Sequence, residues 1–110
     1  KDNKIYVCRG AAGIYCYDMQ GNEQWHYQMP KPLNANNDYK AYANGCWIGD
    51  KYDYVAYGSY GLVVLDKNTH EPIAYRKTPK SANYVVEYNG YIYVAYGQSR
   101  LQVFKLQNAD

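Results

Sequence analysis

"YIYVAYGQSRLQVFKL", residues 91–106, has the pattern of one β-hairpin. Aromatic and β-branched residues stand at nearly every other position on both sides of a short Gly/Ser turn, and such residues favour pleated, half-buried surfaces. Two other stretches repeat the pattern, "YVCRGAAGIYCY" at 6–17 and "YVAYGSYGLVVL" at 54–65. The chain therefore contains three copies of one hairpin.

The spacing of the copies indicates a repeat of about 40 residues. A shift of 39 residues superimposes "YDYVAYG" (52–58) on "YIYVAYG" (91–97), and a shift of 48 carries "YV" at 6–7 onto "YV" at 54–55. The longer spacing comes from "KPLNANNDYK" (31–40), which we expect to be a loop insertion. A period near 40 made of short strands is typical of β-propeller blades, each a four-stranded antiparallel meander.

The pattern predicts an all-β chain with ten strands, which we letter A to D in chain order within each blade. The first copy supplies B, C and D, the second supplies all four, and the third supplies A, B and C. Residues 1–110 are thus a single propeller segment of about two and a half to three blades. The expected strands are 4–9, 13–19 and 23–28 in blade 1 (about 1–30), 41–48, 52–57, 61–66 and 72–77 in blade 2 (about 41–78), and 83–88, 91–96 and 100–106 in blade 3 (about 82–110).

The strand order BCD-ABCD-ABC predicts that the segment belongs to a larger ring. Two copies placed head to tail would set an ABC unit against a BCD unit, which is not a four-stranded blade. A ring closed by a D strand from the N-terminus of a longer protein would instead pair that strand alongside 100–106 and remove a sheet edge. We interpret the chain as the C-terminal part of such a propeller. The alternative is a small chain that completes its ring with another copy by strand exchange.

Packing between blades explains why the repeated runs are nearly continuous hydrophobics, since each strand has two buried faces. We expect Val55 and Val94 to be buried between blades, together with Leu62 and Leu101.

Composition argues against several classes of partner. The net charge is +2 and the lysines are scattered, so we expect no nucleic-acid partner. No apolar stretch approaches the roughly 18 residues of a membrane span. The three cysteines lack the C-x-x-C spacing of zinc sites. Cys8 and Cys16 fall on the two arms of one expected hairpin, which leaves open both a bridge between them and a role as small buried hydrophobes.

No set of residues predicts catalysis. Hydrolytic chemistry needs a nucleophile, a base and an orienting group, whereas His26 and His70 fall on a D strand and in a C–D turn, where we expect ordinary surface residues. Asp18 and Asp66 end C strands, where an Asx-type turn is expected. The sequence has neither a D-x-D-x-D-G calcium loop nor paired carboxylates for glycoside chemistry. We expect no enzyme activity and no cofactor or metal.

A binding surface is better supported than catalysis. In a propeller the B–C and D–A connections lie at the same end. In this chain, which has sixteen tyrosines, these connections contain tyrosine and arginine, the residue types that often dominate interfaces. An alternative for Tyr57 and Tyr96, which occupy the same repeat position, is packing between blades. The candidate binding residues for a protein, peptide or glycan are Arg9, Asn36, Tyr57, Ser59, Tyr60, Tyr96, Gln98, Ser99 and Arg100.

Two stretches resemble known bacterial repeats. "IYVCRGAAGIYCYDMQGNEQWHY" (5–27) resembles a pyrroloquinoline-quinone-like repeat, and "GLVVLD" (61–66) is similar to the core of LVIVD-type repeats. The resemblance implies a bacterial propeller that is periplasmic, secreted or on the cell surface and serves adhesion, scaffolding or assembly. The third copy departs from the pattern, with Arg100 in the place of Gly13 and Gly61, and quinone binding is not carried over. The positions that carry the first resemblance are Tyr6, Val7, Gly13, Asp18, Gly21 and Trp25.

The sequence therefore favours a non-enzymatic binding or scaffold module. One alternative is a fragment of a propeller-class enzyme, a quinoprotein or a polysaccharide lyase, with its catalytic residues in other blades. Another is a lectin-like glycan-binding ring. A charged cluster on the channel wall would favour the enzyme, and a shallow Tyr/Trp shelf between blades would favour the lectin.

Overall fold

The computed structural model describes residues 3–28, 42–97 and 100–105, which form β-strands and no helix. The all-β prediction is confirmed, and every expected strand is present within this part of the chain. The strands are β1 (Ile5–Cys8), β2 (Ile14–Tyr17), β3 (Glu23–Tyr27), β4 (Gly45–Ile48), β5 (Tyr52–Ala56), β6 (Leu62–Asp66), β7 (Pro72–Arg76), β8 (Ala82–Tyr88), β9 (Tyr91–Tyr96) and β10 (Arg100–Lys105). Within these ranges there is no helix of a length and hydropathy suited to crossing a membrane.

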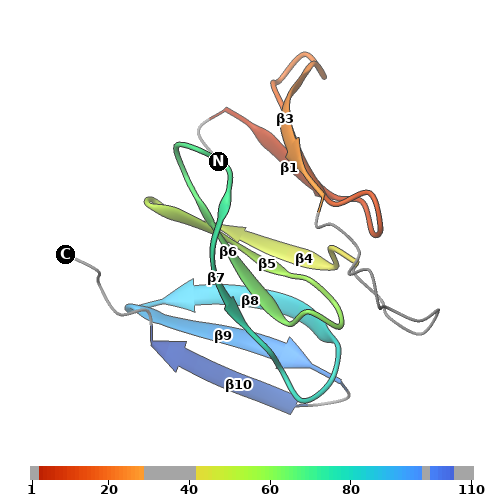
Figure 1. Ribbon diagram of the computed structural model, residues 1–110. Coiled ribbons are helices and arrows are strands. Elements are labelled where there is room, and N and C mark those ends of the chain that lie inside the picture. Colours follow the sequence, from red (N-terminus) through yellow and green to blue (C-terminus); the bar gives the residue numbers. More distant parts are fainter. Residues whose placement is uncertain (1–2, 29–41, 98–99, 106–110) are drawn as a thin grey trace.

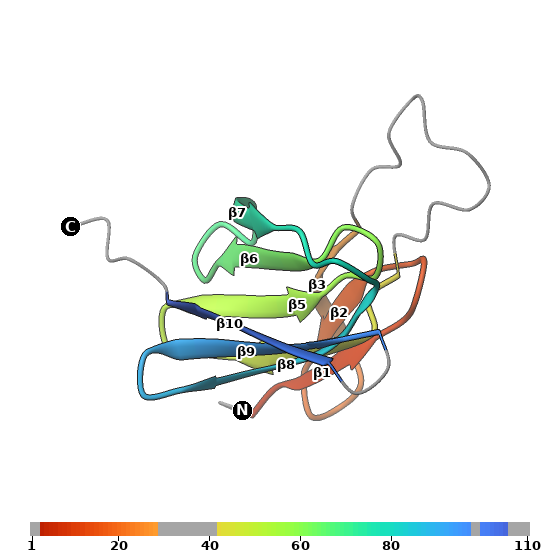
Figure 2. The same ribbon diagram turned by 90° about the horizontal axis from the view of Figure 1, so that it is seen from below.

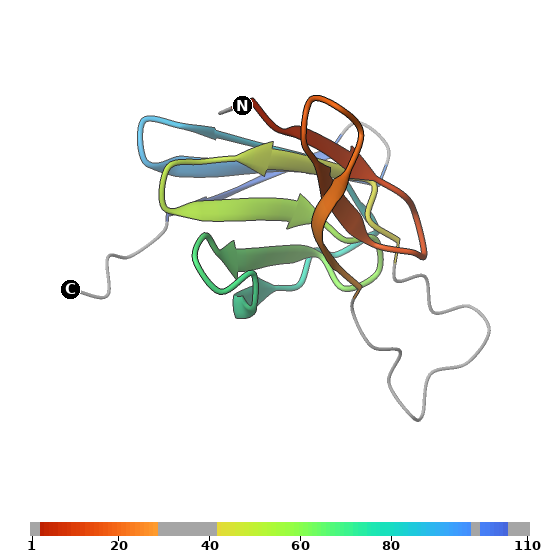
Figure 3. The ribbon, with the colours of Figure 1, turned by 90° about the horizontal axis from the view of Figure 1, so that it is seen from above.

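Antiparallel pairing joins the strands into three sheets. Sheet 1 has the order β1-β2-β3, sheet 2 the order β4-β5-β6-β7, and sheet 3 the order β8-β9-β10. Each sheet is a meander, and the three reproduce the expected grouping BCD, ABCD and ABC. Figure 1 shows sheet 2 between the other two sheets, and the views from below (Figure 2) and from above (Figure 3) show sheet 1, in red and orange, lying across one end of sheet 2.

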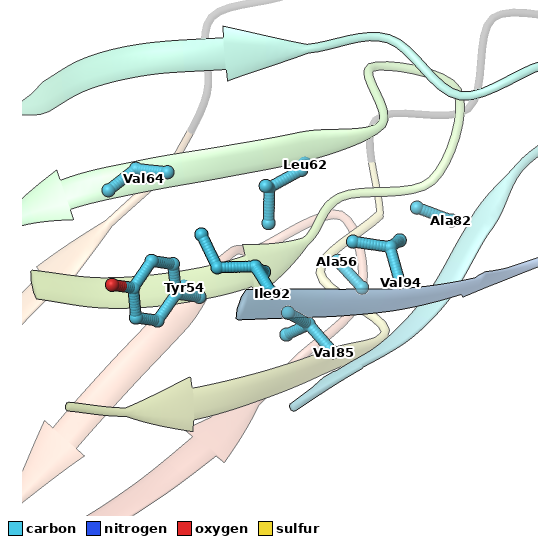
Figure 4. Close-up of a cluster of buried hydrophobic side chains, with 8 residues drawn as sticks. All are labelled: Tyr54, Ala56, Leu62, Val64, Ala82, Val85, Ile92 and Val94. Atoms are coloured by element: carbon cyan, nitrogen blue, oxygen red, sulfur yellow. The ribbon is translucent and has the colours of Figure 1, made fainter. Parts of the chain in front are cut away.

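Sheet 2 is buried on both faces because successive side chains of a strand point to opposite faces. One face packs on sheet 3 in the cluster of Figure 4, which consists of Tyr54, Ala56, Leu62, Val64, Ala82, Val85, Ile92 and Val94. The other face packs on sheet 1 in a second cluster, which consists of Ile14, Ala43, Val55, Tyr57, Val63 and Leu65. These two clusters are the core of the described chain.

Backbone bridges link each sheet to the next. Gly10, in the β1–β2 turn, exchanges two hydrogen bonds with Ala43, and Gly58, in the β5–β6 turn, does the same with Ala82. The sequence predicts a strand from residue 41, whereas β4 begins at Gly45, because Ala43 pairs with the preceding sheet instead. Asn44 adds a third link, donating from Nδ2 to the Ala82 carbonyl over 2.9 Å.

The burial predictions are confirmed for three residues and wrong for one. Val55, Leu62 and Val94 are at most 1 % exposed, but Leu101 is 60 % exposed. Leu101 corresponds to Leu62 under the shift of 39 residues and lies on the face of sheet 3 that points away from sheet 2. No described sheet covers that face, so the same residue type at the same repeat position remains in solvent.

Candidate functional site

A shallow hollow of about 320 Å³ opens beside the β5–β6 turn. Ser59 and Tyr60 line it from that turn, Tyr75 lines it from β7, and Lys77 follows β7 directly. In the strand lettering introduced above, these are the B–C turn, the D strand and the start of the D–A connection of sheet 2. The hollow therefore lies at the end of the molecule where the sequence predicts a binding surface.

Four tyrosines form one cluster at this end, joining sheet 1 to sheet 2. Tyr57 is fully buried at its centre, and its ring meets the rings of Tyr27 and Tyr60 edge to face, each at 6.3 Å between centroids. The phenol of Tyr27 interacts with the phenol of Tyr75. Burial, reinforced by the neighbouring phenols of Tyr75 and Tyr57, raises the pKa of Tyr27. We call Tyr27, Tyr57, Tyr60 and Tyr75 the tyrosine cluster.

The β5–β6 turn sets which ring is buried and which is presented to the hollow. Tyr57 N–H donates to the Gly61 carbonyl at 2.8 Å, Tyr60 N–H to the Tyr57 carbonyl at 3.1 Å, and Gly61 N–H to the Gly58 carbonyl at 2.9 Å. Gly58 and Gly61 both have positive φ, which glycine adopts without a steric penalty. The tight turn that results buries Tyr57 and leaves Tyr60 at the wall of the hollow.

The hollow offers aromatic surface, a hydroxyl and a cation. Tyr75 is 49 % exposed, so a large part of its ring is open to a ligand. Tyrosine and serine together provide rigid contact area and adaptable hydrogen bonds, as in the binding loops of antibodies. Lys77 is exposed and adds a positive charge at the edge. This chemistry suits non-covalent binding.

The structure brings together only part of the predicted binding set. Ser59 and Tyr60 line the hollow, but Tyr57 is buried beneath it, in agreement with the alternative that it packs between sheets. Tyr96 is half-buried at the end of β9, and Arg100 is exposed at the start of β10. Asn36, Gln98 and Ser99 lie outside the described residues.

Arg9 belongs to a different surface. Its guanidinium lies 4.4 Å from the centre of the Tyr15 ring, and its Nη1 donates to the Tyr17 hydroxyl over 3.4 Å. Both rings are on β2, so Arg9 covers part of sheet 1 and is not among the residues lining the hollow. The residues that the sequence prediction missed are Tyr27, Tyr75 and Lys77. The sequence signal that could have identified them is their position at or near the ends of strands β3 and β7, where the D–A connections begin.

A second cleft, of about 370 Å³, lies at the opposite end of the strands, between sheets 2 and 3. Both negative carboxylates and positive ammonium groups line this cleft. The pKa of Tyr54 in its wall is raised to about 12, mainly by burial and then by the charge of Glu87. Tyr54 is only 2 % exposed, so its ring packs in the core more than it faces the cleft. The lining residues are Asp50, Lys51, Tyr52, Tyr54, Glu87, Gly90 and Lys105.

The histidines take structural positions. His26 is exposed, pairs with Glu23 at 2.8 Å and stacks on Tyr15 at 4.7 Å. His70, expected at the surface, is half-buried and stacks on Trp25 of sheet 1 at 4.0 Å. Across the described ranges no three His, Cys, Asp or Glu side chains gather as a metal site would require.

The aspartates that end β6 and follow β2 make the expected turns. Asp66 Oδ1 accepts from the backbone N–H groups of Asn68 and Thr69, at 2.8 and 3.0 Å. Asp18 Oδ1 accepts from those of Gln20 and Asn22, at 2.9 and 2.8 Å. These bonds stabilise the ionised form, so backbone donors lower the pKa of both carboxyls.

Two polar contacts lie inside the interface between sheets 1 and 2. Asp53 is fully buried, and its Oδ1 accepts from Lys67 Nζ at 2.7 Å, while its Oδ2 has no hydrogen-bond partner among the residues that the structure describes. The thiols of Cys8 and Cys46 interact with each other, and all three cysteines are free. The bridge between Cys8 and Cys16 is therefore not formed. Cys8 faces Ile14 across the hairpin and Cys16 faces Tyr6.

No protein-family model matches this chain, and neither does any curated protein. Among solved structures, the chain is similar to the crystal structure of the computationally designed Ika4 protein, with a TM-score of 0.70 and 9 % sequence identity. The likeness covers 97 % of this chain and 62 % of the designed chain. At that identity it concerns the fold alone, and this chain spans less than two thirds of the length of that protein.

Proposed function

We propose that this chain is a non-enzymatic binding or scaffold module made of β-propeller blades. The propeller part of the proposal is supported by three consecutive meanders that pack face to face and by the backbone bridges that link each to the next. The bacterial envelope or extracellular location rests on the resemblance of the repeats. The ring would be completed by further blades.

The observation that carries the binding function is the hollow lined by Ser59, Tyr60, Tyr75 and Lys77. It lies on the B–C and D–A face, and the buried ring of Tyr57 supports Tyr60 from behind. A supported aromatic wall loses little conformational entropy on binding, which favours affinity for a protein, peptide or glycan.

A lectin-like function is a second candidate, because Tyr60 and Tyr75 form a shallow aromatic shelf next to sheet 1. Tyrosine rings present an apolar face together with a hydroxyl, and a sugar ring likewise offers C–H groups and hydroxyls. The enzyme alternative has no comparable observation among the residues that the structure describes.

The test uses two probe sets, an array of bacterial oligosaccharides and a phage-displayed peptide library. We expect Tyr75→Ala to weaken binding by about tenfold or more, as for a central interface aromatic residue. Lys77→Ala should weaken it less. Tyr88→Ala is the matched control, because Tyr88 is an exposed tyrosine at the end of β8 in sheet 3 and does not line the hollow.

Binding to one of the two sets then identifies the class of ligand. No binding by the folded chain to either set, or equal effects of Tyr75→Ala and Tyr88→Ala, would contradict the proposal.

A further inference from the structure

Sheet 3 carries on its uncovered face the residue types that are buried in sheets 1 and 2. Ile14, Leu62 and Leu101 occupy one repeat position and are 0 %, 1 % and 60 % exposed. Cys16, Val64 and Val103 occupy another and are 1 %, 1 % and 49 % exposed. Leu101 pairs with Ala95 and Val103 with Tyr93, so these four share one side of the sheet. We call them the open face of sheet 3.

Sheet 1 likewise has exposed apolar residues, on the face that points away from sheet 2. Val7 corresponds to Val55 and Val94, which are fully buried, yet Val7 is 37 % exposed. Across the β1–β2 hairpin, Val7 pairs with Tyr15 and Ile5 pairs with Tyr17. We call Ile5, Val7, Tyr15 and Tyr17 the open face of sheet 1, because no described sheet packs on it, although Arg9 and His26 lie on its Tyr15 ring. Monomeric proteins seldom expose contiguous apolar faces of this kind without a partner.

We propose that the open face of sheet 3 binds the open face of sheet 1 of a second copy of this chain, head to tail. The occupant follows from the interfaces inside the chain. Leu62 of sheet 2 packs in one cluster with Ile92 and Val94 of sheet 3. The corresponding residues across two copies are Leu101 of one copy and Ile5 and Val7 of the other. The contact would thus continue an interface that the chain already forms.

Face-to-face packing does not require a complete four-stranded blade at the junction. Sheet 1, with three strands, packs on sheet 2, and sheet 2 packs on the three strands of sheet 3. Most of the buried residues in both clusters come from the two central strands of each repeat, β2, β5, β6 and β9. A contact between the ABC sheet of one copy and the BCD sheet of another therefore still contains these central strands. The strand grouping predicted from the sequence does not show this, because it does not say which strands supply the buried residues.

Arg100 disfavours the alternative in which a strand from elsewhere is added to β10. At the same repeat position Gly13 and Gly61 have positive φ, and a Cβ there would collide with the carbonyls of Tyr27 and Arg76, at the ends of β3 and β7. Arg100 does not have a positive φ, so the backbone that lets β3 and β7 approach Gly13 and Gly61 is not repeated at the start of β10. We therefore take the face of sheet 3, and not its edge, as the surface for a partner.

The Asn83 side chain bonds within sheet 3 and not to a following sheet. Asn44 of sheet 2 donates across to the Ala82 carbonyl of sheet 3, whereas Asn83, at the corresponding position, donates to the Gly97 carbonyl within sheet 3, at 3.0 Å. A second copy can therefore dock through side chains alone. Because the two faces differ, the contact is heterologous and generates a closed ring or an open filament, according to the rotation between copies.

The test is light scattering after size-exclusion chromatography of the 110-residue chain and of three aspartate variants. Leu101→Asp disrupts the open face of sheet 3 and Val7→Asp that of sheet 1. Met19→Asp is the matched control, because Met19 has the same 60 % exposure but lies in the β2–β3 turn. We expect the parent chain and Met19→Asp to have the mass of two or more copies, and each of the other two variants to have the mass of one.

The mixture of Leu101→Asp with Val7→Asp is the decisive sample. Each variant keeps the face that the other lacks, so an equimolar mixture should form a complex of two chains. A single-copy parent chain, self-association that survives in either variant, or a mixture that stays at one copy would overturn the proposal. If either variant loses its β-sheet circular dichroism, Leu101→Thr and Val7→Thr, which retain β propensity, replace the pair in the same scheme.

Discussion

Leu62 and Leu101 allow one substitution to be measured in two environments. They hold the same repeat position on β6 and β10, but Leu62 is 1 % exposed between sheets 2 and 3, and Leu101 is 60 % exposed. Leu→Ala removes three carbon atoms. At about 0.8 kcal/mol for each buried methylene, Leu62→Ala should lower the free energy of unfolding by about 2.4 kcal/mol from transfer alone.

The cavity left behind raises the expected cost of Leu62→Ala to between about 2.4 and 5 kcal/mol, because the strands of two sheets meet around it and cannot collapse fully. Leu101 has only two fifths of its surface covered, so Leu101→Ala should cost about 1 kcal/mol or less. The ratio between the two costs, and not either value alone, reports which side of each sheet is covered.

Urea unfolding followed by tryptophan fluorescence measures both costs, since Trp25 lies on sheet 1 and Trp47 on sheet 2. The experiment is run at low protein concentration, so that contacts between copies do not contribute. A cost below about 1 kcal/mol for Leu62→Ala, or equal costs for the two substitutions, would refute the assignment of the buried face.

Two further substitutions probe the backbone and the buried charge. Gly61 has a positive φ, and in Gly61→Ala the new Cβ would collide with the Arg76 carbonyl. We expect this substitution to lower the free energy of unfolding by more than about 1 kcal/mol. A lowered urea midpoint would show this. Lys67→Ala leaves the buried Asp53 carboxylate without its cation and should lower the free energy of unfolding by about 3–5 kcal/mol in the same assay. The double variant Asp53→Ile, Lys67→Met replaces the ion pair by apolar side chains and should be near neutral, since Ile92 is the residue that corresponds to Asp53 in the next repeat.

Strand positions and their grouping could be predicted from the sequence because they depend on local patterns. Alternation of aromatic and β-branched residues marks each strand, and glycines at turns with positive φ, such as Gly58 and Gly90, mark where the hairpins close. The repeat then aligns the hairpins, which places Ser59 and Tyr60 at one end of the sheets. Half of the residues that line the candidate hollow could therefore be named in advance.

The remaining half depended on which side chains of neighbouring strands converge. Tyr75 reaches the hollow because β7 pairs with β6, and Tyr27 joins it from sheet 1 through its contact with Tyr75. The sequence places these residues at the D–A end of their strands, but the local pattern does not show that their side chains meet. Tyr57, which the sequence offers equally as a binding residue or a packing residue, is buried because sheet 1 covers it.

Burial of equivalent residues shows where sequence information ends. The repeat makes Leu62 and Leu101 indistinguishable, and likewise Val7 and Val55, because a periodic pattern specifies only the direction of each side chain. Whether that side chain leaves water depends on a neighbouring sheet, which is a property of tertiary packing. Sheet 2 has a neighbour on both faces, while sheets 1 and 3 each have one. The sequence determined which way each residue points, and the stacking of the sheets decided which of them are buried.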